Sequence, residues 1–244
     1  MKKIFLSFSL NLSLACISLQ PVLATSSFVK LSKFKKEDRE VKNFNGVVAG
    51  GPINVVITLG NTEGLRFEGD ADAIATLITE VVGNKLIIRP QNSWTSWAKK
   101  YENKKITAYV SAKTIQSLTM SGNGSITVKG TIKTNSLTAT LSGSGNITTS
   151  LDVNNFTGII SGSGNLNISG KADVASVTVS GSGSLTKKGF SVGNMSAVVS
   201  GSGSIFVNIE DNIKAVINGS GSINYSGNPT VEKKVFGSGR VRKI

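Results

Sequence analysis

Residues 156–166 read FTGIISGSGNL, and this stretch holds the pattern that decides the fold. Apolar residues alternate with small or polar ones, a Gly-Ser-Gly triplet follows, and the alternation then resumes. Alternate side chains of a β-strand lie on the same face. The stretch therefore predicts two strand segments that meet at a glycine-rich bend and share one apolar row.

The pattern occurs seven times in the second half of the chain. The first glycines of successive copies are 21, 19, 19, 20, 18 and 18 residues apart. A unit of about 20 residues cannot bury its apolar face alone, so the copies must stack. The two-glycine cores are Gly122/Gly124, Gly143/Gly145, Gly162/Gly164, Gly181/Gly183, Gly201/Gly203, Gly219/Gly221 and Gly237/Gly239.

The shared register favours an all-β solenoid of roughly 20-residue coils. A meander or sandwich with hairpins at the glycines is the alternative, but its neighbouring copies would run in opposite directions and need no common template. We expect both glycines of each core to face inward, because a Cβ on the concave side would strike the opposite wall and a corner requires positive φ. Seven coils stacked at about 4.8 Å give a rod of roughly 35 Å.

The Ser-Gly-Ser-Gly-Asn/Ser-Ile/Leu repeat resembles that of the bacterial GIN domain, the head domain of an auto-transporter adhesin family. The upstream runs Phe44–Val47, Ile53–Ile57 and Asn84–Ile88 fit the same resemblance, which spans roughly residues 41–241. It implies a right-handed, single-stranded β-helix that is exported to the cell envelope or surface. It brings no catalytic residues with it.

The chain divides into four predicted regions. Residues 1–24 read as a signal peptide, with basic Lys2 and Lys3, an apolar stretch and small residues before Thr25. A membrane anchor and a lipoprotein modified at Cys16 are the alternatives. A polar leader at 25–43 precedes an N-terminal β layer at 44–110, with one short helix after an Asp70 N-cap, and the repeat β-helix at 111–244.

The composition argues against an enzyme. The chain has no histidine, and its single cysteine lies in the signal peptide, so the commonest general base and metal ligands are missing. Asp152 and Asp173 are 21 residues apart and would stack one coil apart as a weak carboxylate pair, although solvated turn residues explain them better. We expect no cofactor and no metal site.

The chain is strongly basic, and it stays so after the predicted signal peptide is removed. Loss of Lys2 and Lys3 lowers the formal charge from +13 to +11. The charge is compatible with an anionic envelope polymer as partner, and the alternative is that cationic ends only keep the rod soluble. No nucleic-acid motif and no membrane-spanning segment after the signal are found. Exposed coil ends would permit oligomerisation.

Two sets of residues are candidates for binding a partner. One is the outward serines between the paired glycines, Ser144, Ser163, Ser182 and Ser202, which would form a ladder matching a repetitive glycan. The other is the segment Gln91–Lys105, whose Trp94, Trp97 and Tyr101 would form an exposed aromatic loop. Alternatively, these rings close the end of the N-terminal layer.

The sequence thus predicts a non-catalytic exported protein of the periplasm, outer surface or medium, with adhesin-like binding of glycans or surface polymers. A periplasmic structural or stress-related factor is the second interpretation. A polysaccharide-active β-helix enzyme is the third.

Overall fold

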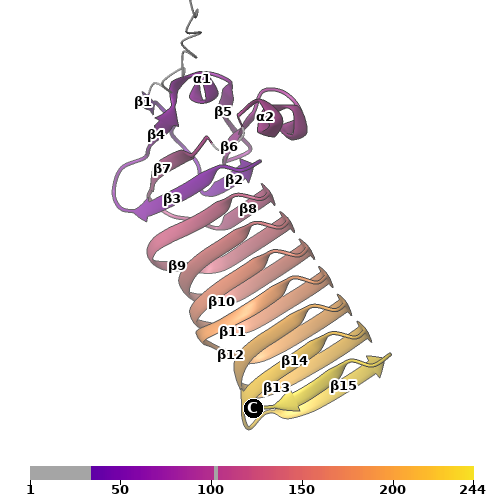
Figure 1. Cartoon of the computed structure of the whole chain (residues 1–244). Helices are drawn as coiled ribbons and strands as arrows, with labels where there is room; N and C mark the ends of the chain where they lie inside the picture. Colours follow the sequence, from indigo (N-terminus) through magenta and orange to yellow (C-terminus); the bar gives the residue numbers. More distant parts are fainter. Residues whose placement is uncertain (1–33, 102–103) are drawn as a thin grey trace, which may run out of the picture. The chain divides into compact units, whose positions relative to one another are not determined.

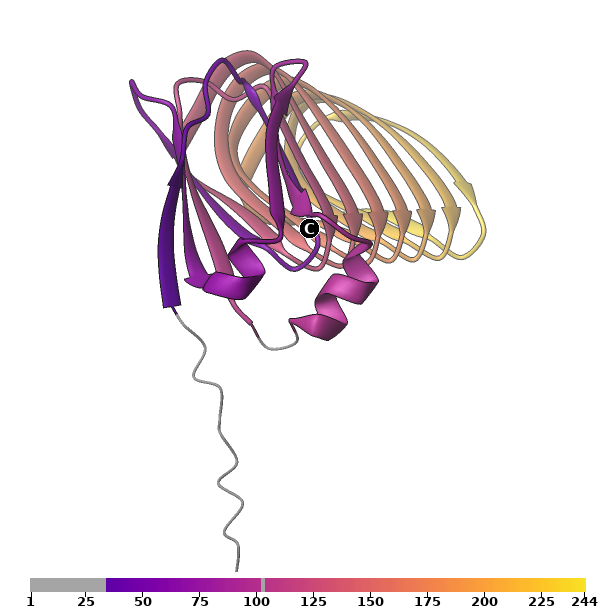
Figure 2. The same ribbon diagram turned by 90° about the horizontal axis from the view of Figure 1, so that it is seen from above.

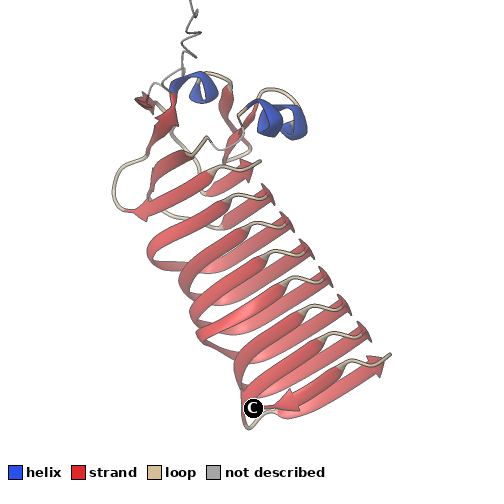
Figure 3. Cartoon of the chain, in the orientation of Figure 1, coloured by secondary structure: helices blue, strands red, loops and turns tan. Residues whose placement is uncertain are grey.

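A computed structural model describes residues 34–101 and 104–244 of the chain. The chain divides into two units, residues 1–31 and Ser32–Ile244, and all described residues belong to the second. The predicted signal peptide and its cleavage site therefore lie outside the described residues. The second unit is built on one sheet of sixteen strands, and its two short helices both lie near the N-terminal end (Figure 3).

Five long strands form the body of the solenoid. Each begins just after one glycine core and runs to the first glycine of the next core (Figure 1). Every pair within the body is parallel, which excludes the meander and confirms the predicted solenoid. The strands are β9 (Ser125–Gly143), β10 (Asn146–Gly162), β11 (Asn165–Gly181), β12 (Ser184–Gly201) and β13 (Ser204–Gly219).

Equivalent residues of successive copies pair directly. Gly143, Gly162 and Gly181 are in register, as are Ile147 and Leu166. The register shifts only in the part of each coil that follows the glycine core, for example between Thr148 and Ser150. This is where copies of 18 to 21 residues differ in length. Seen from above, the coils form a series of similar loops, one behind another (Figure 2).

The two glycines of a core have different tasks. The first adopts positive φ, +113° at Gly143 and +125° at Gly162, and it is not an inward residue. The second is buried, and a Cβ added at Gly164 would lie 2.3 Å from the Gly145 carbonyl oxygen. The expected collision is therefore with the backbone of the preceding coil, not with the opposite wall.

The carbonyl of each first glycine ties one corner to the next. The Gly143 oxygen accepts hydrogen bonds from Ser163 N and Gly164 N, both at 3.0 Å, and the Gly162 oxygen accepts two from the following corner at 2.9 Å. These bonds continue the pairing between coils through the bend.

The N-terminal strands interleave with the solenoid. Strand β2 (Gly46–Gly50) lies between β6 (Lys85–Pro90) and β8 (Ser117–Gly122), and β3 (Asn54–Leu59) lies between β7 (Ile106–Ala112) and β9. All of these pairs are parallel. Parallel strand pairing therefore continues across residue 110, the predicted boundary between the N-terminal β layer and the repeat β-helix.

Antiparallel strands close the N-terminal end. Strand β4 (Gly64–Asp70) pairs with β7, and β5 (Leu77–Val82) pairs with β6. Asp70 caps helix α1 (Ala71–Ile74) through a 3.0 Å bond from Ala73 N, which confirms the predicted N-cap.

The charged run at 34–39 is a strand, so the predicted leader at 25–43 is wrong for this part. Strand β1 (Phe34–Arg39) pairs antiparallel with β4 because its charges find partners there. Lys36 pairs with Glu68 at 3.1 Å. Arg39 donates to the Leu77 and Ile74 carbonyls at 2.7 and 3.0 Å, and its guanidinium lies 4.8 Å from the centre of the Phe67 ring.

The apolar core runs along the whole coil axis. Inward side chains of each coil, such as Leu141, Ile160 and Val179, are completely buried. At the C-terminal end the last coil consists of β14 (Ser222–Gly227), β15 (Thr230–Phe236) and β16 (Arg240–Lys243). Strand β15 pairs with β13, and β16 pairs with β14.

Candidate binding surfaces

The corner serines form an exposed row of hydroxyl groups. Ser144, Ser163, Ser182 and Ser202 are all exposed and stand one coil apart, about 4.8 Å in a β-stack. Their backbone N–H groups donate to the preceding coil. Within residues 34–101 and 104–244, no hydrogen bond joins their Oγ atoms to another protein group. These hydroxyls are therefore available to a ligand or to water.

The column beside this corner is different, because its polar groups bond to one another. Asn165 donates to Asn146 Oδ1 at 3.2 Å, and the hydroxyls of Ser204 and Ser222 lie 3.1 Å apart. Similar pairs occur at the second bend, where Asn154 donates to Asn135 at 3.0 Å. Much of the hydrogen-bonding capacity of these side chains is therefore used between neighbouring coils of the stack.

The wall leading into the corner carries an uncharged outward face that the sequence interpretation missed. Its central column consists of β-branched residues, one per coil, in direct register: Ile87, Val48, Thr119, Thr140, Ile159, Thr178, Val198 and Val216. Ile159 is 37% exposed, and the five copies 117–121, 138–142, 157–161, 176–180 and 196–200 contain no charge. Alternation directed attention to the inward row, but the outward row repeats as regularly.

Serine and threonine columns flank this β-branched column on both sides. One side has Ser117, Thr138, Thr157, Ser176 and Ser196, and the other has Ser121, Ser142, Ser161, Ser180 and Ser200. Together with the corner serines, the face presents methyl groups bordered by hydroxyls. It could bind an uncharged molecule that is itself amphiphilic.

The aromatic loop is not a loop. Residues 94–100 form helix α2 (Trp94–Lys100), and the expected exposure of Trp97 and Tyr101 is wrong. The Trp97 ring is 4% exposed and its Nε1 donates to Thr76 Oγ1 at 2.8 Å, while the Tyr101 hydroxyl donates to the Asp72 carbonyl at 3.1 Å. The two ring centroids lie 5.0 Å apart. The burial of Trp97 against Thr76 favours the alternative interpretation, in which the rings close the end of the N-terminal layer. The Trp94 side chain lies outside the described part.

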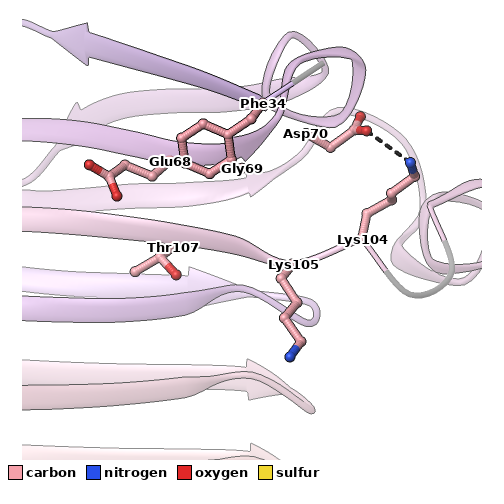
Figure 4. Close-up of a pocket in the computed structure, with 7 residues that line it drawn as sticks. All are labelled: Phe34, Glu68, Gly69, Asp70, Lys104, Lys105 and Thr107. Atoms are coloured by element: carbon pink, nitrogen blue, oxygen red, sulfur yellow. Dashed lines mark ion pairs between the residues drawn. The ribbon is translucent and has the colours of Figure 1, made fainter. Parts of the chain in front are cut away.

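A cavity of about 460 Å³ opens beside Asp70, the N-cap residue of helix α1 (Figure 4). The Lys104 ammonium lies 3.1 Å from Asp70 Oδ2, whose carboxylate also caps α1, and the Lys105 side chain points away from this pair. Phe34, Glu68, Gly69 and Thr107 complete the lining. The Asp70 carboxylate thus serves both the helix cap and an ion pair.

The two aspartates considered as a carboxylate pair do not meet. Asp152 is in register with Lys171, and their charged atoms lie 3.6 Å apart. Asp173 falls two positions further along its strand, because Ala172 and Val174 pair with Val153 and Asn155. Across the described ranges, no group of three potential metal-ligating side chains is found, and no helix is long and apolar enough to span a membrane.

The family of the chain follows from the combination of this solenoid and its corner repeat. A family described as "Putative auto-transporter adhesin, head GIN domain" matches residues 43–229. The chain belongs to this family. No curated protein matches it significantly.

Solved structures with related folds carry adhesin and lipid-binding names. A putative adhesin from Bacteroides fragilis is 24% identical with a TM-score of 0.76, over 87% of this chain and 97% of that one. A putative adhesin from Parabacteroides merdae is 20% identical with a TM-score of 0.68, over 88% and 97% of the two chains. A putative lipid binding protein from Parabacteroides distasonis is 21% identical with a TM-score of 0.66, over 88% and 98%. At these identities the likeness establishes the shared fold.

Proposed function

We propose that this protein is a non-catalytic, exported adhesin that binds a neutral surface polysaccharide along its uncharged face and corner serines. The observation that carries the proposal is the exposed row of corner hydroxyls without protein partners, bordering a charge-free face. The adhesin names of the family and of the Bacteroides fragilis structure support it.

The chemistry of a sugar chain suits this surface. A pyranose ring has apolar C–H faces and a rim of hydroxyls, so it can pack on the β-branched stripe while it hydrogen-bonds to flanking serines. The coil repeat of about 4.8 Å presents each type of group again and again. Many weak contacts along one polymer then add up to useful avidity.

Alanine at the four corner serines tests the proposal. Their backbone bonds do not involve the side chain, so Ser144, Ser163, Ser182 and Ser202→Ala should fold normally. Each hydrogen bond lost removes roughly 0.5–1.5 kcal/mol, so we expect the quadruple variant to bind polysaccharide at least about tenfold more weakly on a glycan array and in a pull-down.

The matched control changes four polar residues at the second bend, where amides already pair with one another. Asn135, Asn154, Asn194 and Asn212→Ala should bind like the unchanged protein. Equal binding by the corner variant and the unchanged protein, on every polysaccharide that binds, would remove the corner serines from the function. The site of export is tested separately by N-terminal sequencing, which should find Thr25 first, and by protease treatment of intact cells.

A further inference from the structure

In the last coil, the inward row of side chains contains lysines as well as apolar residues. Val231 and Val235 pair with the core residues Ile213 and Ile217, but Lys233 takes the position opposite Ala215. On the facing strand, Lys243 takes the position opposite Tyr225. The apolar core of the stack therefore ends with two lysines in the inward row. One earlier lysine has such a position, since Lys187 pairs with the buried Ile168.

Two cavities meet at this end and share two arginines. One, of about 490 Å³, is lined by Lys233, Val235, Gly239, Arg240, Val241 and Arg242. The other, of about 290 Å³, is lined by Ser220, Gly221, Ser222, Ser238, Arg240 and Arg242. The first cavity thus has valines in its lining and the second has serines, and both arginines line both cavities.

The cations at this end have no acidic partners. Among the described residues, no ion pair involves Lys233, Arg240 or Arg242. The nearby acid, Glu232, lies 3.9 Å from Lys214 instead. The positive charge is therefore free to attract an anion from solution.

A hydrogen bond to the neighbouring strand β14 holds the Arg242 side chain in place. Its Nε donates to Asn224 Oδ1 at 2.6 Å, and Asn224 is fully buried and donates to the Ser222 hydroxyl at 3.1 Å. This bond fixes the guanidinium and leaves its terminal nitrogens as donors. Bidentate contact with a phosphate or carboxylate is the interaction that such a fixed fork favours.

We propose that the C-terminal end of the solenoid binds an anionic amphiphile, with its phosphate or carboxylate head between Arg240 and Arg242 and its apolar tail on Val235 and Val241. Val235 is 38% exposed, so burial of a tail there has a hydrophobic gain. A second copy of this end is a poor occupant, because five cations, Lys233, Lys234, Arg240, Arg242 and Lys243, would face their own kind. This site lies apart from the proposed polysaccharide face.

Titration calorimetry with three probes tests the proposal on the purified protein. Dodecyl phosphate, kept below its micelle concentration, should bind. Inorganic phosphate lacks the tail and dodecyl maltoside lacks the charge, and each should bind at least about tenfold more weakly. Equal binding of inorganic phosphate would reduce the site to a simple anion site, and equal binding of dodecyl maltoside would show that charge is irrelevant; either result overturns the proposal.

Two pairs of variants locate the binding. Arg240→Gln with Arg242→Gln should weaken dodecyl phosphate binding by roughly tenfold or more, because charge-assisted hydrogen bonds are lost. Lys129→Gln with Lys133→Gln removes the same charge from exposed positions of β9 and should leave binding unchanged. Equal loss in both pairs would mean a non-specific charge effect and would refute the site. The corner-serine variant should bind dodecyl phosphate normally, which separates this inference from the proposed function.

Discussion

Substituting the first glycine of a corner should be far more costly than substituting a glycine whose backbone is equally unusual but unobstructed. Gly162 has φ +125°, and a Cβ there would lie 2.5 Å from the Gly143 carbonyl oxygen. Gly130 has φ +94° with nothing within 4 Å of the added Cβ. Gly60 has neither constraint. The three sites separate backbone strain from collision with the neighbouring coil.

The expected magnitudes follow from these geometries. A non-glycine residue in this φ region costs about 1–3 kcal/mol, which applies to both Gly162→Ala and Gly130→Ala. Collision with a backbone that cannot move away costs roughly 1–3 kcal/mol more, and only Gly162→Ala incurs it. Gly60→Ala should be neutral or stabilise by about 0.4–1 kcal/mol, because it restricts the unfolded chain.

Urea unfolding followed by circular dichroism gives the free energy of unfolding for each variant, with the slope checked for constancy. The reasoning predicts Gly162→Ala as the least stable, then Gly130→Ala, then Gly60→Ala. If Gly162→Ala and Gly130→Ala lost the same stability, the close approach of successive corners would not be what requires glycine there.

Three further predictions concern the two ends of the stack. Trp97→Ala should lower the free energy of unfolding by roughly 3–5 kcal/mol, while Trp97→Phe should lose less, as measured by urea unfolding; near-neutral values for both would contradict its burial. Hydrogen bonds from Lys35 and then Arg39 lower the pKa of Glu37 below its usual 4.5, so Glu37 stabilises the attachment of β1 above that pH and the stabilisation is lost as the pH falls through the lowered pKa. The protection of β1 amides against hydrogen exchange, taken relative to the intrinsic exchange rate at each pH, should therefore fall as the pH drops through the lowered pKa, and Glu37→Gln should abolish this pH dependence. Lys233→Leu with Lys243→Leu should make the last coil self-associate, seen by light scattering, since inward charge protects a sheet edge; a monodisperse monomer would argue against that role.

The repeat predicted the body of the fold well, because its evidence is self-consistent. Seven glycine cores in one register leave few ways to bury Leu141, Ile160 and Val179 other than stacking. The parity of the pattern also placed the corner serines on the surface. What local parity could not reveal was the direction of the steric conflict at Gly164, which depends on the coil below.

The N-terminal end was harder to predict, since its structure depends on partners that are remote in sequence. The run at 35–40 looks like a solvated linker until Glu68 and the Leu77 carbonyl are seen to satisfy Lys36 and Arg39. The burial of Trp97 was hard to predict for the same reason, because its hydrogen-bond partner Thr76 lies 21 residues away. The outward β-branched column, in contrast, was present in the repeat and could have been found by aligning the copies at every position.

The interleaving of β2 and β3 has a consequence for how the chain acquires its structure. The coil made first by the chain is not the terminal layer of the stack, since β6 and β7 come to lie on its outer side and β8 and β9 on its inner side. A chain that emerges N-terminus first can pair the outer edge of this coil once β6 and β7 have emerged, but its inner edge stays open until residue 129 has emerged. The stack therefore grows on both sides of this coil, and the order of its layers at the N-terminal end differs from the order of the sequence.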